Sequence, residues 1–377
     1  MAKLFVPKER SGGERRVAAT PETVKKFVKA GLVVEVEAGA GEGSSISDQR
    51  FADAGAAIVS DASASWSSAD IVAKVAVPSP DEAGRLKPGA VLVSFMAPHR
   101  NLDAVRVLER RGVTTLAMEL VPRTTRAQTM DALSSQANIA GYKSVLIAAA
   151  RLGKYFPLLM TAAGTVPPAR VVIMGAGVAG LQAIATAKRL GAVVEVSDVR
   201  AAAKEQVESL GAKFIELPMQ ESGEGTGGYA KEMSEDFLRK QREIVMQHLA
   251  KADVVICTAL VPGKKAPVLI NDEALKVMRA GAIVVDLAIT EGGNCTQSKA
   301  DEDVTWNGVH ILAPSNLAAT MAEDASVVYS RNVHALVMNF VKDGNVVLDL
   351  GDEINAGSLL THEGKVTHAP TAALVQS

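Results

Sequence analysis

The feature that most constrains the fold is a glycine pattern near the middle of the chain, Gly175-Ala-Gly-Val-Ala-Gly180. The β-branched run Val171–Met174 precedes it, and an alanine-rich stretch up to Leu190 follows it. A strand that passes through such glycines directly into a helix is typical of the first crossover of a parallel sheet. Gly175 permits the tight turn, and Gly180 lets the helix pack closely on the strand. We therefore expect a doubly wound α/β domain around this turn.

Further β-branched runs follow the glycine pattern and are separated by helical stretches. The expected strands are Val193–Ser197, Lys213–Glu216, Asp253–Cys257, Ala282–Asp286 and Val309–Leu312. Together with Val171–Met174 they make six, the number in a full Rossmann fold. A glycine-rich insert, Glu221–Tyr229, interrupts the series, and four glycines in nine residues favour a flexible surface loop over a helix or strand.

The first third of the chain alternates strands and helices in the same way, which predicts a second, mostly parallel sheet. The expected strands are Leu4–Pro7, Leu32–Val36, Ala56–Val59, Ile71–Val75, Val91–Phe95 and Thr115–Met118. The expected helices begin at Pro21, with Thr20 as N-cap, and cover Asp48–Ala54 and Asn101–Arg111. This region lacks a glycine-rich phosphate loop, so its fold alone implies no cofactor.

A long helix, Ala132–Leu152, is expected to connect the two domains, and a loop with Gly164 and Pro167-Pro168 follows it. A final helix over Met321–Val341 is expected to return to the first domain, ahead of a polar tail with a strand-like piece at Val346–Leu350. The prediction is an α/β chain of two doubly wound domains. Residues 1–133 plus 323–377 form the first, and residues 134–322 form the second, which is the full Rossmann domain.

Composition excludes several other classes of protein. With 377 residues, 48% hydrophobic and 22% charged, the chain has a globular composition and room for two cores. A net charge of −2 gives no electrostatic reason to expect nucleic acid as a partner. The start has no apolar signal segment, and no apolar run reaches the roughly 18 residues of a membrane span. Cys257 and Cys295 lack CxxC spacing and are expected to be buried thiols, so no metal site is predicted.

The glycine pattern points to a dinucleotide ligand. Gly177 allows the backbone to approach a pyrophosphate, which the N-terminus of the following helix attracts through its unpaired N–H groups. The next strand ends at Asp198, where a carboxylate accepts hydrogen bonds from the adenosine ribose and repels a 2′-phosphate. NAD is therefore favoured over NADP, although the nearby Arg200 weakens that inference.

Several motifs outside the glycine turn resemble those of the proton-translocating NAD(P) transhydrogenases, specifically the NAD(H)-binding component of their alpha subunit. The matching stretches are Thr161–Arg170, Leu181–Gly191, Asp198-Val-Arg200, Met118–Gln136 and Gly227–Met233. The likeness covers nearly the whole chain. It implies an NADP-binding beta subunit and a small membrane subunit as partners, a homodimer of this component, and a cytoplasmic place at the inner membrane held by those partners.

The resemblance also implies roles for individual residues. Arg123, Gln128, Asp131 and Ser134 would surround the nicotinamide, with Gln128 reaching toward NADP(H) on the partner and Tyr229 closing over the nucleotide. The further positions where the family contacts NAD(H) are Val178, Asp198, Val199, Arg200, Gly228, Gln241 and Leu260. Direct hydride transfer needs orienting groups and no general acid or base, which suits this set. A solvated surface ion pair is the alternative interpretation of Arg123 and Asp131.

Alanine dehydrogenase shares this architecture and is the alternative function. Its substrate carboxylate would lie near Arg16 and Lys74. The histidine that such an enzyme needs for proton transfer is replaced by Ala97, and an expected acid is replaced by Thr290. We interpret Arg16 and Lys74 as structural residues paired with acids inside the first domain, and His99 as a displaced surface residue. A third possibility is an NAD-binding module without chemistry, which gives no reason for the Arg123–Asp131 segment.

Overall fold

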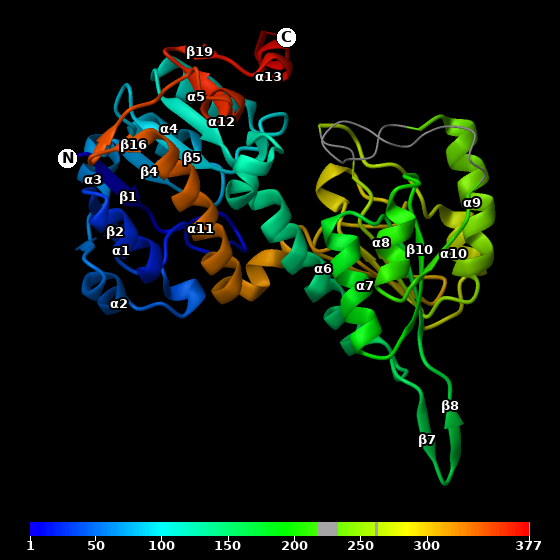
Figure 1. Ribbon diagram of the computed structural model, residues 1–377. Coiled ribbons are helices and arrows are strands. Elements are labelled where there is room, and N and C mark those ends of the chain that lie inside the picture. The colour runs from blue at the N-terminus through cyan, green and yellow to red at the C-terminus, as the bar shows by residue number, and fades with distance from the viewer. Residues whose placement is uncertain (218–232, 261–262, 377) are drawn as a thin grey trace. The chain divides into compact units, whose positions relative to one another are not determined.

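The computed structural model describes residues 1–217, 233–260 and 263–376 (Figure 1). The chain forms two compact units, the first made of Met1–Gln136 and Ala319–Ser377 and the second of Ala137–Ala318. These limits lie within a few residues of the expected domain boundaries. Each unit is built on a mostly parallel sheet with helices on both faces, so the predicted fold class is confirmed.

Unit 1 contains an eight-stranded sheet in the order β19-β18-β6-β5-β4-β1-β2-β3. Its parallel strands have the order of a doubly wound nucleotide-binding fold. The strands are β1 Lys3–Val6, β2 Val33–Glu37, β3 Ala57–Val59, β4 Ile71–Ala73, β5 Val91–Ser94, β6 Thr114–Ala117, β18 Leu359–His362 and β19 Lys365–Val366. β18 pairs antiparallel with β6 and so extends the sheet with a segment from near the C-terminus.

Helices cover both faces of this sheet, and each face has its own apolar core. Apolar side chains of α1, α2 and α11 pack on one face, and those of α3, α4 and α5 pack on the other. The helices of unit 1 are α1 Pro21–Lys29, α2 Asp48–Asp53, α3 Ser63–Ser68, α4 Pro80–Arg85, α5 Leu102–Arg110, α11 Ala322–Phe340, α12 Glu353–Ser358 and α13 Ala369–Gln376. Burial on both sides explains why central strands such as β4 and β5 are almost entirely apolar.

Unit 2 contains a seven-stranded sheet in the order β11-β10-β9-β12-β13-β15-β14, which includes the full Rossmann series. The strands are β9 Arg170–Met174, β10 Val193–Ser197, β11 Lys213–Phe214, β12 Val254–Cys257, β13 Ile283–Asp286, β14 Asp303–Trp306 and β15 Val309–Leu312. All six expected strands are present. The edge strand β14 was not expected and pairs antiparallel with β15.

The helices of unit 2 also divide between the two faces of its sheet. Apolar residues of α6, α7 and α8 form one core, and those of α9 and α10 form the other. The helices are α6 Ala132–Arg151, which begins in unit 1, α7 Val178–Arg189, α8 Ala203–Ser209, α9 Glu235–Leu249 and α10 Asp272–Val277. This arrangement directs the start of α7 to the carboxyl edge of the sheet, where ligands bind in such folds.

Two expectations about irregular segments were wrong. The expected loop around Gly164 is a β-hairpin of β7 Leu159–Thr161 and β8 Gly164–Val166, which Figure 1 shows extending from the rest of unit 2. The expected strand-like piece Val346–Leu350 is reduced to β17 Asn345–Val346, paired with β16 Val341–Lys342. Nowhere in the described residues is there a helix with the length and apolar character needed to cross a membrane.

Candidate functional site

The turn between β9 and α7 has the backbone geometry that its glycines permit. Gly175 adopts a φ of 103°, which disfavours any residue with a side chain. A Cβ on Gly180 would lie 1.9 Å from the carbonyl oxygen of Gly175, so only glycine fits at the first turn of the helix. The Thr258 hydroxyl, just after β12, donates to the Gly175 carbonyl at 3.0 Å. The turn is therefore held tightly against the neighbouring strand.

Gly177 differs from the other two glycines because it faces open space. It is the N-cap of α7 with φ −72° and ψ −171°, an ordinary extended conformation, and a Cβ there would meet no atom of the described residues within 4 Å. The first N–H groups of a helix lack partners within the helix and attract anions. A phosphate group could therefore approach the backbone at Gly177 without meeting a side chain.

Asp198, immediately after β10, is tied into this turn. Its carboxylate accepts a hydrogen bond from the Ala176 N–H at 2.6 Å, and the Arg200 guanidinium donates to it through Nε at 3.0 Å and Nη2 at 2.8 Å. The Arg200 N–H donates as well, at 2.8 Å. The expected ribose acceptor is therefore also a structural link between β10 and the phosphate turn.

Gln241 of α9 is another buried polar group near the end of β10. Its Nε2 donates to the Ser197 hydroxyl at 3.1 Å, while its Oε1 is buried and accepts no hydrogen bond from the described residues. A buried amide oxygen without a donor is costly, and a ligand hydroxyl would satisfy it. Val178 and Val199 are half-buried and Leu260 is exposed, whereas Gly228 and Tyr229 lie outside the described residues.

In unit 1, the segment expected to act on the nicotinamide brings three polar side chains together. Ser134 donates to Asp131 through its N–H at 2.9 Å and through its hydroxyl at 2.6 Å. Arg123 Nη2 lies 3.9 Å from Asp131 Oδ2 and 3.4 Å from Ser134 Oγ. Gln128, on the 3₁₀ helix Thr125–Met130, is exposed, and its side chain makes no hydrogen bond with the described residues.

The cations that an amino-acid substrate would need are bound to acids of unit 1. Arg16 donates through Nε and Nη2 to Glu14, at 2.8 and 2.7 Å. The fully buried Lys74 lies 3.0 Å from Glu9. Burial raises the pKa of Glu9, although the neighbouring Lys74 opposes that rise. The prediction that Arg16 and Lys74 are paired with acids inside the first domain is confirmed.

The two positions that argued against an amino-acid oxidoreductase have no proton-transfer group. Ala97 adopts a φ of 38°, and its N–H donates to the Glu119 carboxylate. Burial raises the pKa of Glu119, which also accepts from the Met96 N–H. Thr290 lies in a short 3₁₀ helix, Ile289–Glu291. His99 is half-buried, so its description as a surface residue was incomplete.

Sequence reasoning missed the groups that shape the edge of the sheet beside the turn. Asn294 is fully buried and exchanges hydrogen bonds with the main chain of Ala259, at 3.1 and 2.9 Å. Asp286, at the end of β13, accepts from the Asn294 N–H at 2.8 Å and from the Ser298 hydroxyl at 2.7 Å. The sequence signal that could have indicated this group is the carboxylate of Asp286 at the end of an apolar strand. Among the described residues, no cluster of His, Cys, Asp or Glu could hold a metal ion.

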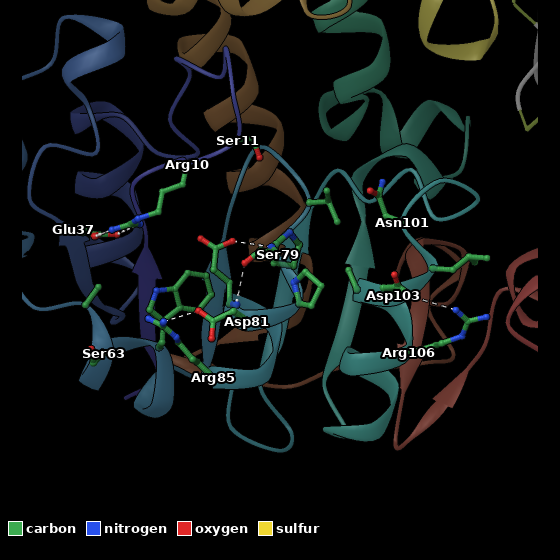
Figure 2. Close-up of a pocket in the computed structure, with 18 of the residues that line it drawn as sticks. Arg10, Ser11, Glu37, Ser63, Ser79, Asp81, Arg85, Asn101, Asp103 and Arg106 are labelled. Carbon is green, nitrogen blue, oxygen red and sulfur yellow. Dashed lines mark hydrogen bonds and ion pairs between the residues drawn. The ribbon is translucent and has the colours of Figure 1, made fainter.

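A pocket of about 900 Å³ lies in unit 1, beyond the carboxyl ends of its strands (Figure 2). It contains none of the residues that the sequence singled out as site residues. Several of its charged groups pair with one another, as Arg10 does with Glu37 and Arg106 with Asp103 at 3.2 Å. Because acids and bases alternate around it, the lining does not select a ligand by charge.

Comparisons with known proteins agree with this arrangement. The family description "Alanine dehydrogenase/PNT, N-terminal domain" matches residues 5–140, and "Alanine dehydrogenase/PNT, C-terminal domain" matches residues 144–369. An NAD(P) transhydrogenase subunit alpha protein of Rhodospirillum rubrum is 49% identical over 375 residues, 97% of this chain and 98% of that protein. Alanine dehydrogenase of Mycolicibacterium smegmatis is 30% identical over 368 residues, 96% of this chain and 93% of that one.

Among the solved structures, a transhydrogenase is again more similar to this chain than an alanine dehydrogenase. The crystal structure of transhydrogenase from Sinorhizobium meliloti matches with a TM-score of 0.88 and 45% identity, over 97% of this chain and 99% of that one. An L-alanine dehydrogenase structure matches with a TM-score of 0.83 and 26% identity, over 99% of both chains. The chain belongs to the alanine dehydrogenase/PNT family, on the side of the NAD(P) transhydrogenase alpha subunits.

Proposed function

We propose that this chain is the NAD(H)-binding component of a proton-translocating transhydrogenase. The observation that carries the proposal is the turn at Gly175–Gly180, with its open approach at Gly177 and the N-terminus of α7 beneath it. The Gln241 oxygen gives independent support, because it accepts no hydrogen bond within the described part of the chain and a bound nucleotide hydroxyl would satisfy it. Both features fit a dinucleotide and require no metal.

The residues of the Arg123 segment would orient the nicotinamide. When bound as NADH, the cofactor would supply a hydride to NADP+ held by a partner subunit, leaving NAD+ and NADPH, and no proton accompanies that hydride. Asp131 is fixed by two bonds from Ser134, so it can hold the Arg123 guanidinium in place for a carboxamide. Gln128 has both donors and an acceptor available to bridge two nucleotides. Gly228 keeps its proposed contact with NAD(H), and Tyr229 keeps its proposed role of closing over the nucleotide.

The partners in this proposal are an NADP-binding beta subunit and a small membrane subunit. The transhydrogenase relatives are named as subunits, which supports a multi-subunit assembly. The proton path would lie in those other chains, and they would hold this one at the inner membrane. A homodimer of this component completes the proposed assembly.

The test is reconstitution with the NADP-binding partner. The mixture should exchange hydride between NADH and an NADP analogue, followed by absorbance. Gln128→Asn should slow that exchange while the Kd for NADH changes little, because the shorter amide keeps its chemistry but loses its reach. Gln206→Asn, a change at an exposed glutamine of α8, is the matched control and should behave as the parent.

Other outcomes would contradict the proposal. Reduction of NAD by L-alanine in the chain alone would identify an amino-acid dehydrogenase. NADH binding without either activity, in the presence of the partner, would leave a binding module. A large loss of NADH affinity in Gln128→Asn with normal turnover would refute the bridging role.

A further inference from the structure

We propose that the Arg200 guanidinium can act as a receptor for a 2′-phosphate, and that its ion pair with Asp198 prevents this binding. The inference rests on the proposed binding of a dinucleotide at the Gly175–Gly180 turn. It deepens that function by assigning the preference between NAD(H) and NADP(H) to a pair of residues, where the sequence had suggested Asp198 alone.

The first step is the saturation of the Asp198 carboxylate. It accepts hydrogen bonds from the Ala176 N–H, the Arg200 N–H, and the Nε and Nη2 groups of Arg200, at 2.6 to 3.0 Å. A carboxylate has about four acceptor positions, so the protein fills all of them. The side chains of Asp198 and Arg200 are 5% and 18% exposed, and their pairing is therefore only weakly screened by solvent.

The second step is the position of the pair. Asp198 follows β10, and in this fold the residue that ends the second strand lies beside the adenosine ribose. A carboxylate there disfavours a 2′-phosphate, whereas a nearby arginine accommodates one. A guanidinium also matches a phosphate by forming two parallel hydrogen bonds. This chain places both groups at one site, two residues apart, with the acid occupying the arginine.

The consequence is that removing the charge of Asp198 has two separable effects. The site loses the repulsion toward a 2′-phosphate, and the Arg200 guanidinium loses the carboxylate charge that faces it. Asp198→Asn is the suitable change because its amide oxygen can still accept from the Ala176 N–H. Asp198→Ala would remove that link to the turn as well, and should also weaken NADH binding.

The experiment compares the dissociation constants of NADH and NADPH, by calorimetry, for the parent, Asp198→Asn, and Asp198→Asn combined with Arg200→Ala. In Asp198→Asn, the ratio of the NADPH Kd to the NADH Kd should fall by roughly 10-fold or more, the size of one charge-assisted hydrogen bond. The double variant should lose the gain in NADPH affinity while its NADH affinity stays near that of the single variant. Adenosine 2′,5′-bisphosphate and AMP form a matched ligand pair that isolates the 2′-phosphate.

Each result supports or overturns the proposal. If the double variant keeps the NADPH gain, relief of repulsion explains it and Arg200 is no receptor. An unchanged ratio in Asp198→Asn also overturns it. If the parent binds NADH and the ratio of the NADPH Kd to the NADH Kd is the same in Asp198→Asn, only this inference fails. A parent protein that binds neither nucleotide refutes the proposed function itself.

If the Asp198 variants do not fold, the single variant Arg200→Ala provides a second test of the proposal. Arg200→Ala leaves the bond between Asp198 and the Ala176 N–H in place and removes the counter-charge of the acid. It should weaken NADPH binding relative to NADH, because the carboxylate then repels the 2′-phosphate without compensation. An equal effect on both nucleotides would overturn the proposal.

Discussion

Replacing Gly180 by alanine tests whether the close contact inside the phosphate turn is a requirement of the fold. The added Cβ would lie 1.9 Å from the Gly175 carbonyl oxygen and 3.2 Å from the Thr258 hydroxyl. Ordinary van der Waals contact begins at 3.4 Å, so the helix and the turn would have to separate by about 1.5 Å. The obstructing atom belongs to the main chain and cannot rotate away.

The magnitude follows from two opposing contributions. Overpacking in a well-packed region costs about 1 to 3 kcal/mol, and more where the main chain must move. Alanine recovers about 1 kcal/mol through its higher helix propensity. Because the clash involves a carbonyl already fixed by Thr258, we expect a net loss of about 2 kcal/mol or more in the free energy of unfolding.

Gly177→Ala is the matched change in the same turn. Its Cβ would meet no atom within 4 Å in the part of the chain that the structure describes, and its φ of −72° suits alanine, so stability without ligand should change by less than about 0.5 kcal/mol. The methyl group would instead occupy the space expected for a phosphate. NADH binding should therefore weaken by about 1 to 3 kcal/mol.

Urea unfolding without nucleotide and calorimetric titration with NADH measure the two effects on the same preparations. Gly180→Ala should lower the free energy of unfolding measured in urea, and Gly177→Ala should weaken the NADH binding measured by calorimetry. A Gly180→Ala protein as stable as the parent would refute the steric reasoning. Parental NADH affinity in Gly177→Ala would place the pyrophosphate elsewhere.

Three further predictions concern charges and thiols. Arg126 holds the pKa of Asp352 at about 2, below its ordinary 3.8, so this pair adds stability above pH 3.8 that is lost as the pH falls through 2. Arg126→Ala should flatten that dependence in urea unfolding between pH 5 and 2, and an unchanged profile would contradict it. Lys74→Met leaves Glu9 buried without its counter-charge and should cost about 3 to 5 kcal/mol, whereas adding Glu9→Gln should restore much of it; a single variant with parental stability would be inconsistent. Burial raises the pKa of Cys295 to about 11, so a thiol reagent at pH 8 should react far faster in urea than with the native protein, and equal rates would show the site to be open.

The sequence predicted the elements whose signals are local. Val193–Ser197 and Val309–Leu312 have the expected bounds because both are rich in the β-branched residues that strands favour. The hairpin of β7 and β8 escaped prediction because it contacts no core, and its Met160 is 73% exposed. No hydrophobic pattern marks a strand that is not buried.

The candidate site likewise contains residues that the sequence could indicate and residues that it could not. Gly175, Gly177 and Gly180 were recognisable because a turn with a positive φ and a close approach demands glycine. Thr258 was not, since its hydroxyl reaches the Gly175 carbonyl across 83 residues of sequence. Nor could the sequence indicate that the carboxylate of Asp198 is already saturated by its own neighbours.

The antiparallel pairing of β18 with β6 has a consequence for biosynthesis. The Thr361 hydroxyl donates to the Val113 carbonyl, which was synthesised 248 residues earlier. Unit 2 is continuous in sequence, so it can fold on the ribosome while β6 is still an open sheet edge. An open edge invites pairing with other chains, and the incomplete first unit is therefore the nascent form most in need of protection by chaperones.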